Sequence, residues 1–173
     1  MRIAHGIRFS FILAALAAVI VLRPLRGGAA ANDRPSPGTL GLSLNVPGIG
    51  VRYFLTERYS FEAKAQTSKN TVVAGLRTYR YFQSRYFLPY MGMEADFINF
   101  KGDVTKGTGM AFGLFAGGEH FFARRLSTQF DCGPALIHLS NQASRVSVDT
   151  IEIVMNLSVN FYFLGGAAKE RKP

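Results

Sequence analysis

The sequence predicts an all-β chain that forms an antiparallel up-and-down transmembrane β-barrel of about eight strands. Three observations point to this fold class: an export leader, alternation of apolar and polar residues along most segments, and aromatic residues beside the short turns. The 173 residues include 15 Phe, 7 Tyr and 18 Gly but no Trp. Such a composition suits strands and tight turns better than packed helices.

The first 31 residues have the layout of a cleaved signal peptide. Arg2 and Arg8 give a positive start, residues 9–22 carry no charge, and Ala29–Ala31 offer small residues for cleavage. A helix of that uncharged length reaches only about 21 Å, whereas the hydrocarbon core of a membrane is about 30 Å thick. Cleavage is therefore favoured over a membrane anchor. We expect a signal peptide over 1–31, a linker over 32–37, the barrel over 38–163 and a polar periplasmic tail over 164–173.

Eight segments have strand-like patterns, and the connections between them alternate in length. Three short turns alternate with more polar links, of which those at 101–109 and 140–148 are the longest. If the N-terminus starts in the periplasm, every short turn falls on the periplasmic side, as in bacterial outer-membrane barrels. The first hairpin, around Pro47, could instead be one irregular strand. The expected strands are 39–46, 48–55, 59–66, 71–82, 86–100, 110–122, 126–139 and 149–163.

Aromatic residues flank each short turn, as in the segment Tyr81-Phe82-Gln83-Ser84-Arg85-Tyr86-Phe87. Aromatic rings favour the headgroup level of a membrane, where barrels carry them as girdles. The last strand alternates most clearly and ends in Phe163. We expect its apolar face to contact lipid, together with Phe115 of the sixth strand. That face consists of Ile151, Ile153, Met155, Leu157, Val159, Phe161 and Phe163.

The opposite face of the strands carries charged residues that would point into the barrel. An eight-stranded barrel is too narrow for an open channel, so side chains fill its interior. Charges placed there need opposite charges and hydrogen bonds. We expect ion-pair packing, with a proton or ion path as the alternative. The inward acids and the lysine are Glu62, Lys64, Glu94, Asp96, Glu119 and Glu152, with Arg52 and Arg77 as candidate partners.

Charge and cysteine content restrict the possible partners. The formal net charge is +9, but four arginines lie in the leader, which leaves +5 for the mature chain. The remaining basic residues are spread singly, so we expect lipid headgroups or solvent around them and no nucleic acid. Cys132 is the single cysteine, which excludes an intramolecular disulfide. Without a Cys–His cluster we expect no metal site and no cofactor.

Residues 38–163 resemble outer-membrane β-barrel-domain proteins. The resemblance is carried by the aromatic hairpins, by Thr56-Glu57-Arg58-Tyr59-Ser60 and by the glycine-rich strands. It implies a location in the bacterial outer membrane, contact with its lipid and lipopolysaccharide, and insertion by the barrel-assembly machinery. It does not imply a particular activity.

A shorter motif lies at the end of the seventh strand. His138-Leu139-Ser140-Asn141, with Gly133 five residues before the His and Glu152 fourteen residues after it, resembles the lipid A 3-O-deacylase family. The resemblance implies an eight-stranded outer-membrane esterase in which Ser140 is the nucleophile, His138 its base and Glu152 the residue that orients the imidazole. Strand alternation places Glu152 on the lumen face, whereas His138 and Ser140 share the outward face. A bulge near residue 150 would bring the three together.

Three functions follow from these patterns. The first is an outer-membrane barrel with a structural or surface-interaction role and no reaction of its own. The second is a lipid A 3-O-deacylase-like esterase that acts on lipopolysaccharide. The third is a soluble periplasmic lipid-binding barrel, which the apolar outward faces disfavour.

Overall fold

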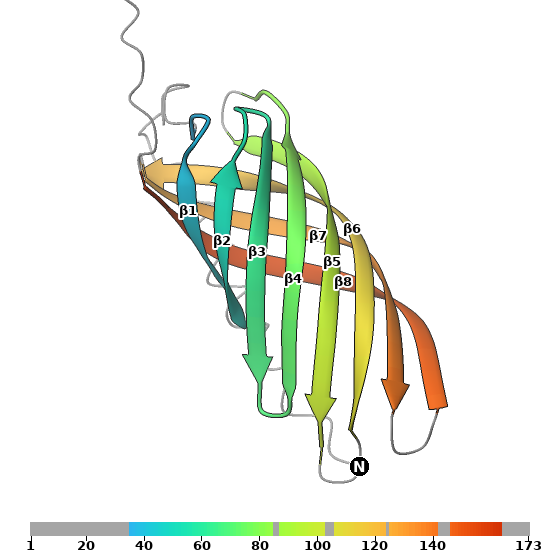
Figure 1. Cartoon of the computed structure of the whole chain (residues 1–173). Coiled ribbons are helices and arrows are strands. Elements are labelled where there is room, and N and C mark those ends of the chain that lie inside the picture. The colour runs from blue at the N-terminus through green and yellow to red at the C-terminus, as the bar shows by residue number, and fades with distance from the viewer. Residues whose placement is uncertain (1–34, 85–86, 103–105, 124, 142–145, 164–173) are drawn as a thin grey trace, which may run out of the picture.

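The computed structural model describes residues 35–84, 87–102, 106–123, 125–141 and 146–163. They form a closed barrel of eight antiparallel strands in sequence order, with β1 paired to β8 (Figure 1). The prediction of an all-β, up-and-down barrel is confirmed. The expected signal peptide over 1–31 and tail over 164–173 lie outside the described residues. The strands are β1 (Leu40–Asn45), β2 (Gly48–Phe54), β3 (Tyr59–Ser68), β4 (Thr71–Tyr81), β5 (Leu88–Lys101), β6 (Lys106–Ala123), β7 (Leu126–Asn141) and β8 (Val146–Phe163).

The two ends of the barrel differ. We call the end where Leu40 of β1 pairs with Phe163 of β8 the terminal end, and the connections β2–β3, β4–β5 and β6–β7 also lie there. The opposite end, called the far end, has the other four connections. In Figure 1 the terminal end is at the top.

The first hairpin consists of two strands, as expected, with Asn45 of β1 opposite Gly48 of β2. The starts of two later strands differ from the expectation. Strands β6 and β8 begin at Lys106 and Val146, earlier than expected, so both long links are shorter than the polar residues suggested. The reason is pairing: the polar segment that opens β6 forms a ladder with β5 and β7, from Lys101↔Lys106 onward. Ladder hydrogen bonds satisfy the backbone regardless of side-chain polarity.

The barrel has polar and aromatic residues inside and apolar residues outside. Along β8, Ser158, Asn160 and Tyr162 are buried in the lumen, whereas Ile151 and Ile153 are 72% and 71% exposed on the outer surface. In the described residues no helix is long and apolar enough to cross a membrane. The alternation expected for the last strand is confirmed.

The expected outward position of Phe115 is wrong. Phe115 is 7% exposed inside the barrel, while its neighbour Leu114 is 60% exposed outside. Strand β5 explains this choice, because Gly92 lies opposite Phe115 in the ladder. A Cβ at Gly92 would overlap the Phe115 ring, so the glycine leaves the space that the ring fills. Strand β6 is apolar on both faces, so its alternation alone could not settle the orientation.

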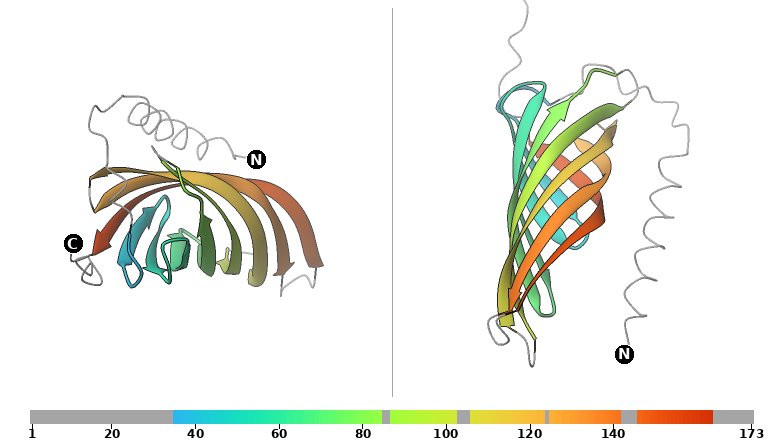
Figure 2. Two further views of the ribbon diagram at one scale, coloured as in Figure 1. Left: turned by 90° about the horizontal axis from the view of Figure 1, so that it is seen from above. Right: turned by 90° about the vertical axis from the view of Figure 1, so that its right-hand side faces the viewer.

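The wall is lower at β1 and β2 than elsewhere. Strand β1 pairs with β8 only from Asn45↔Ser158 to Leu40↔Phe163. Within the described residues, the segment Val146–Leu157 of β8 is therefore paired only with β7. Figures 1 and 2 show the β1–β2 hairpin ending well before the tips of the other strands.

Candidate functional site

His138 and Ser140 lie near the far end of β7, on the outer surface of the barrel. Side chains on one face of a strand are two positions apart in the sequence. His138 and Ser140 therefore share a face with the exposed Leu136. The ladder places Met110 of β6 beside His138 and Thr108 beside Ser140. The expected common face of His138 and Ser140 is confirmed.

Asp149 of β8 is the carboxylate that His138 contacts. The two residues are directly opposite in the β7–β8 ladder, and His138 Nδ1 lies 2.6 Å from Asp149 Oδ1. The side chains are 50% and 72% exposed. A hydrogen bond from Nδ1–H to a carboxylate fixes the tautomer and leaves Nε2 able to accept a proton. The sequence argument missed Asp149, although its odd number, like that of Ile151, placed it on the outward face of β8.

Glu152 lies apart from His138 and Ser140. It is opposite Ala135 in the ladder, and its even number places it on the lumen side with Val154 and Asn156. The register between β7 and β8 runs without a shift from Leu126↔Phe161 to Asn141↔Val146. The bulge that would bring Glu152 to the outer face is therefore absent from these paired residues. A catalytic role for His138, Ser140 and Glu152 together stays a prediction.

The terminal half of the lumen contains a dense polar network around Arg52. Its guanidinium bonds Glu62 Oε2 through Nε at 2.9 Å and Nη2 at 2.5 Å, and Gln129 Oε1 through Nη2 at 2.6 Å. Arg52 and Glu62 are fully buried. Burying two charges is costly unless each is paired and hydrogen-bonded, and here the network meets that condition. The phenolic hydroxyls of Tyr79, Tyr81 and Tyr162 also accept hydrogen bonds from Arg52.

A second charged group lies nearer the far end. Arg77 Nη2 bonds Asp131 Oδ1 at 2.8 Å, and its Nε lies 2.7 Å from Glu94 Oε2. Lys64 Nζ pairs with Glu94 and lies 3.0 Å from Asp96 Oδ2. The expected inward positions of Glu62, Glu94, Asp96 and Glu119 are confirmed, as is the pairing of Arg52 and Arg77 with acids of this set. Sequence reasoning missed Asp131, although it shares the parity of the polar Gln129 and Ser127 on β7.

The fold and its polar interior define a small up-and-down β-barrel that carries a buried ionic core. No family model matches the chain, and a search of curated proteins finds no match either. Within the described ranges, no group of three or more His, Cys, Asp and Glu residues is arranged to hold a metal ion.

Proposed function

We propose that this chain is an integral outer-membrane protein whose role is structural or in surface interaction. The observation that carries the proposal is the inverted distribution of polarity. Fully buried Arg52 and Glu62 lie inside, and exposed Leu, Ile, Met and Phe side chains cover the outside. A water-soluble protein of this size seldom exposes such a continuous apolar surface, whereas a membrane barrel requires one.

Strand length and aromatic placement support the same proposal. Strands β3 to β8 have 10 to 18 residues, and a tilted strand crosses the hydrocarbon core in about 9–11 residues. Exposed rings gather near the terminal end, as expected for a girdle at one interface. They are Tyr59, Phe61, Phe82, Phe87, Phe122, Phe161 and Phe163. This end would face the periplasm.

Fractionation of cells that express the full chain tests the proposal. We expect the protein in the outer-membrane fraction, resistant to extraction with high salt and carbonate, and faster on SDS gels when it is not boiled. Recovery of folded protein in the soluble periplasmic fraction without detergent would contradict the proposal. That result would favour the soluble lipid-binding barrel.

A second candidate function is the hydrolysis of an ester-linked acyl chain of lipid A. It is favoured by one observation, the contact of His138 Nδ1 with Asp149 on the same outward face as Ser140. In this candidate the Ser140 hydroxyl attacks the ester carbonyl and His138 Nε2 accepts its proton, then returns it to the leaving alkoxide. Water completes the hydrolysis of the acyl-serine. Mass spectrometry of lipid A from an expressing host tests this candidate.

A further inference from the structure

A hollow of about 260 Å³ lies at the terminal end of the barrel, where β3 begins and β4 ends. The two strands are held together there, because the Tyr81 amide donates a 2.8 Å hydrogen bond to the Arg58 carbonyl and Tyr59 is opposite Arg80 in the ladder. The lining residues are Arg58, Tyr59, Arg80, Tyr81, Phe82 and Gln83. Two arginines and three aromatic residues thus surround one hollow.

The two arginines give the hollow a positive charge. Arg58 and Arg80 are both exposed, and neither guanidinium forms an ion pair with a described residue. Glu57, which precedes Arg58 in the β2–β3 connection, is exposed and also forms no ion pair among these residues. The two guanidinium groups are therefore available to an anion from outside the protein.

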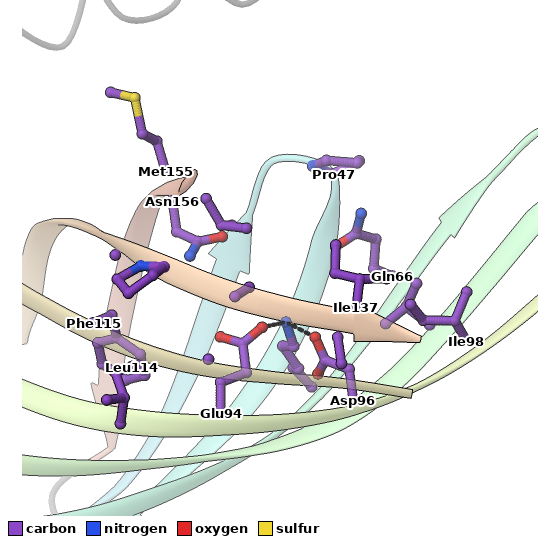
Figure 3. A pocket seen from close by; sticks show the side chains of 18 of the residues that line it. Pro47, Gln66, Glu94, Asp96, Ile98, Leu114, Phe115, Ile137, Met155 and Asn156 are labelled. Carbon is purple, nitrogen blue, oxygen red and sulfur yellow. Dashed lines mark hydrogen bonds and ion pairs between the residues drawn. The ribbon is translucent and has the colours of Figure 1, made fainter. Parts of the chain in front are cut away.

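The cations of the lumen, by contrast, are already occupied. The Lys64 nitrogen is shared by Glu94 and Asp96, whose carboxylates turn toward it in Figure 3. Arg52 and Arg77 each bond a buried carboxylate. An anion would thus find unpaired guanidinium groups at the hollow and none among these three side chains.

The arginines are held in place before any ligand binds. Thr56 Oγ1 accepts hydrogen bonds from the backbone N–H groups of Arg58 and Tyr59, at 3.1 and 3.0 Å. Arg80 Cζ lies 5.5 Å from the centroid of the Phe82 ring, a distance at which the ring attracts the cation. Groups that are already positioned lose less conformational freedom when they bind a ligand.

An apolar outer surface continues from the hollow toward the middle of the barrel. Phe61 and Ala63 follow Tyr59 on the outward face of β3. Leu76 is 60% exposed on the outward face of β4, and the ladder pairs it with Ala63. A molecule with an anionic head at the arginines would therefore find an apolar surface for its aliphatic chains.

We propose that the hollow binds the phosphate of an anionic phospholipid. Arg58 and Arg80 donate charged hydrogen bonds to the phosphate oxygens, and the acyl chains lie along Phe61, Ala63 and Leu76. A choline head would bring a further cation beside both arginines, so a head with net negative charge is preferred. The adjoining apolar surface favours a lipid over free phosphate. That the lipid belongs to the periplasmic leaflet rests on the proposed membrane location of this chain.

The test uses the folded barrel in nanodiscs of phosphatidylcholine with phosphatidylglycerol as the minor lipid. One or the other lipid carries a photoactivatable diazirine in an acyl chain, and labelled residues are mapped by mass spectrometry. Enrichment is the labelling by phosphatidylglycerol divided by the labelling by phosphatidylcholine at the same residue. We expect enrichment at Phe61 and Leu76, reduced by unlabelled phosphatidylglycerol and not by inorganic phosphate at matched ionic strength. Equal enrichment at all outward positions, or its loss in inorganic phosphate, would overturn the proposal.

Two variants and one control make the test specific. Arg80→Gln should lower the enrichment about fivefold, the contribution of one basic residue near an anionic lipid surface, and the double variant Arg58→Gln/Arg80→Gln should abolish it. Arg125→Gln is the matched control, since Arg125 is exposed in the β6–β7 connection at the same end, and it should leave the enrichment at Phe61 and Leu76 unchanged. These arginines are exposed, so their replacement should leave the fold intact, which gel mobility without boiling checks.

Full enrichment in the folded double variant would overturn the proposal, as would an equal fall in Arg125→Gln. If the double variant does not fold, unchanged enrichment in Arg80→Gln alone has the same consequence. Protein that fractionates with the outer membrane but is labelled evenly would overturn the lipid site alone. Recovery of folded protein in the soluble fraction would instead contradict the proposed function, so the two failures are distinguishable.

Discussion

The Arg52 guanidinium of β2 donates hydrogen bonds to the Glu62 carboxylate of β3 through Nε and Nη2, and both side chains are fully buried. The two residues are directly opposite in the β2–β3 ladder. A Cβ on Gly50 would overlap the Glu62 carboxylate, so the glycine on the same strand as Arg52 makes room for its partner. This pair connects the short N-terminal hairpin to the rest of the barrel.

Loss of one member of this pair should destabilise the barrel strongly. Glu62→Leu leaves the Arg52 charge without its main partner in the lumen, and breaking a buried pair costs about 3–5 kcal/mol. Urea unfolding in detergent or lipid measures the change. Glu57→Leu is the matched control, since Glu57 is exposed in the β2–β3 connection, and it should change the free energy of unfolding little. Equal effects of the two substitutions would show that the network does not stabilise the fold.

Phe115 should matter much more for stability than Phe112. Phe115 is buried and Arg77 lies over its ring, with Cζ 4.1 Å from the ring centroid, whereas Phe112 is exposed on the outer surface. Removal of a buried Phe side chain costs about 3–5 kcal/mol. Phe115→Ala should therefore lower the unfolding midpoint clearly, and Phe112→Ala should lower it less. The reverse order would contradict the inward position of Phe115.

The outer surface can be tested with two neighbouring residues of β8. Leu157 points outward, whereas Asn156 points inward and donates to Asp131 Oδ1 at 2.9 Å. An Arg at the midplane of a lipid-facing surface costs about 2–4 kcal/mol, while an Arg at position 156 would lie beside the Asp131 carboxylate. Leu157→Arg should thus reduce the amount of assembled barrel in the outer membrane more than Asn156→Arg. Equal assembly would count against a lipid-facing outer surface.

Much of the fold could be predicted because the strands of a barrel alternate with a period of two. That period placed Arg52, Glu62 and Ile153 on their correct faces. It did not place Phe115, because Phe112, Leu114 and Phe115 make both faces of β6 apolar and the deciding residue, Gly92, is on another strand. The candidate site shows the same limit. The alternation along β7 predicts that His138 and Ser140 share a face. The contact between His138 and Asp149 depends on the β7–β8 register, which no local pattern encodes.

Export predicts a definite mature N-terminus. The positive start and the uncharged run at 9–22 are typical of a signal peptide, so the protein purified from membranes should begin near Asn32. Edman sequencing or intact-mass measurement identifies the first residue. A mature chain that still begins at Met1 would contradict cleavage.

The last prediction separates the structural role from the esterase and, within the esterase, separates two carboxylates. If the esterase proposal holds, expression in a host with lipopolysaccharide should remove one acyl chain from lipid A, as seen by mass spectrometry. Ser140→Ala and His138→Ala should abolish that loss, since a serine hydroxyl is a weak nucleophile without its base. Both side chains lie outside the buried core, so their removal should leave assembly intact.

Asp149→Asn should slow the reaction by about 10²-fold or more, because the imidazole loses the carboxylate that holds its tautomer. Glu152→Gln should have little effect, because the β7–β8 ladder pairs Glu152 with Ala135 and pairs His138 with Asp149. A larger loss in Glu152→Gln than in Asp149→Asn would favour the set implied by the sequence motif, and intact lipid A beside well-assembled protein would leave the structural role alone.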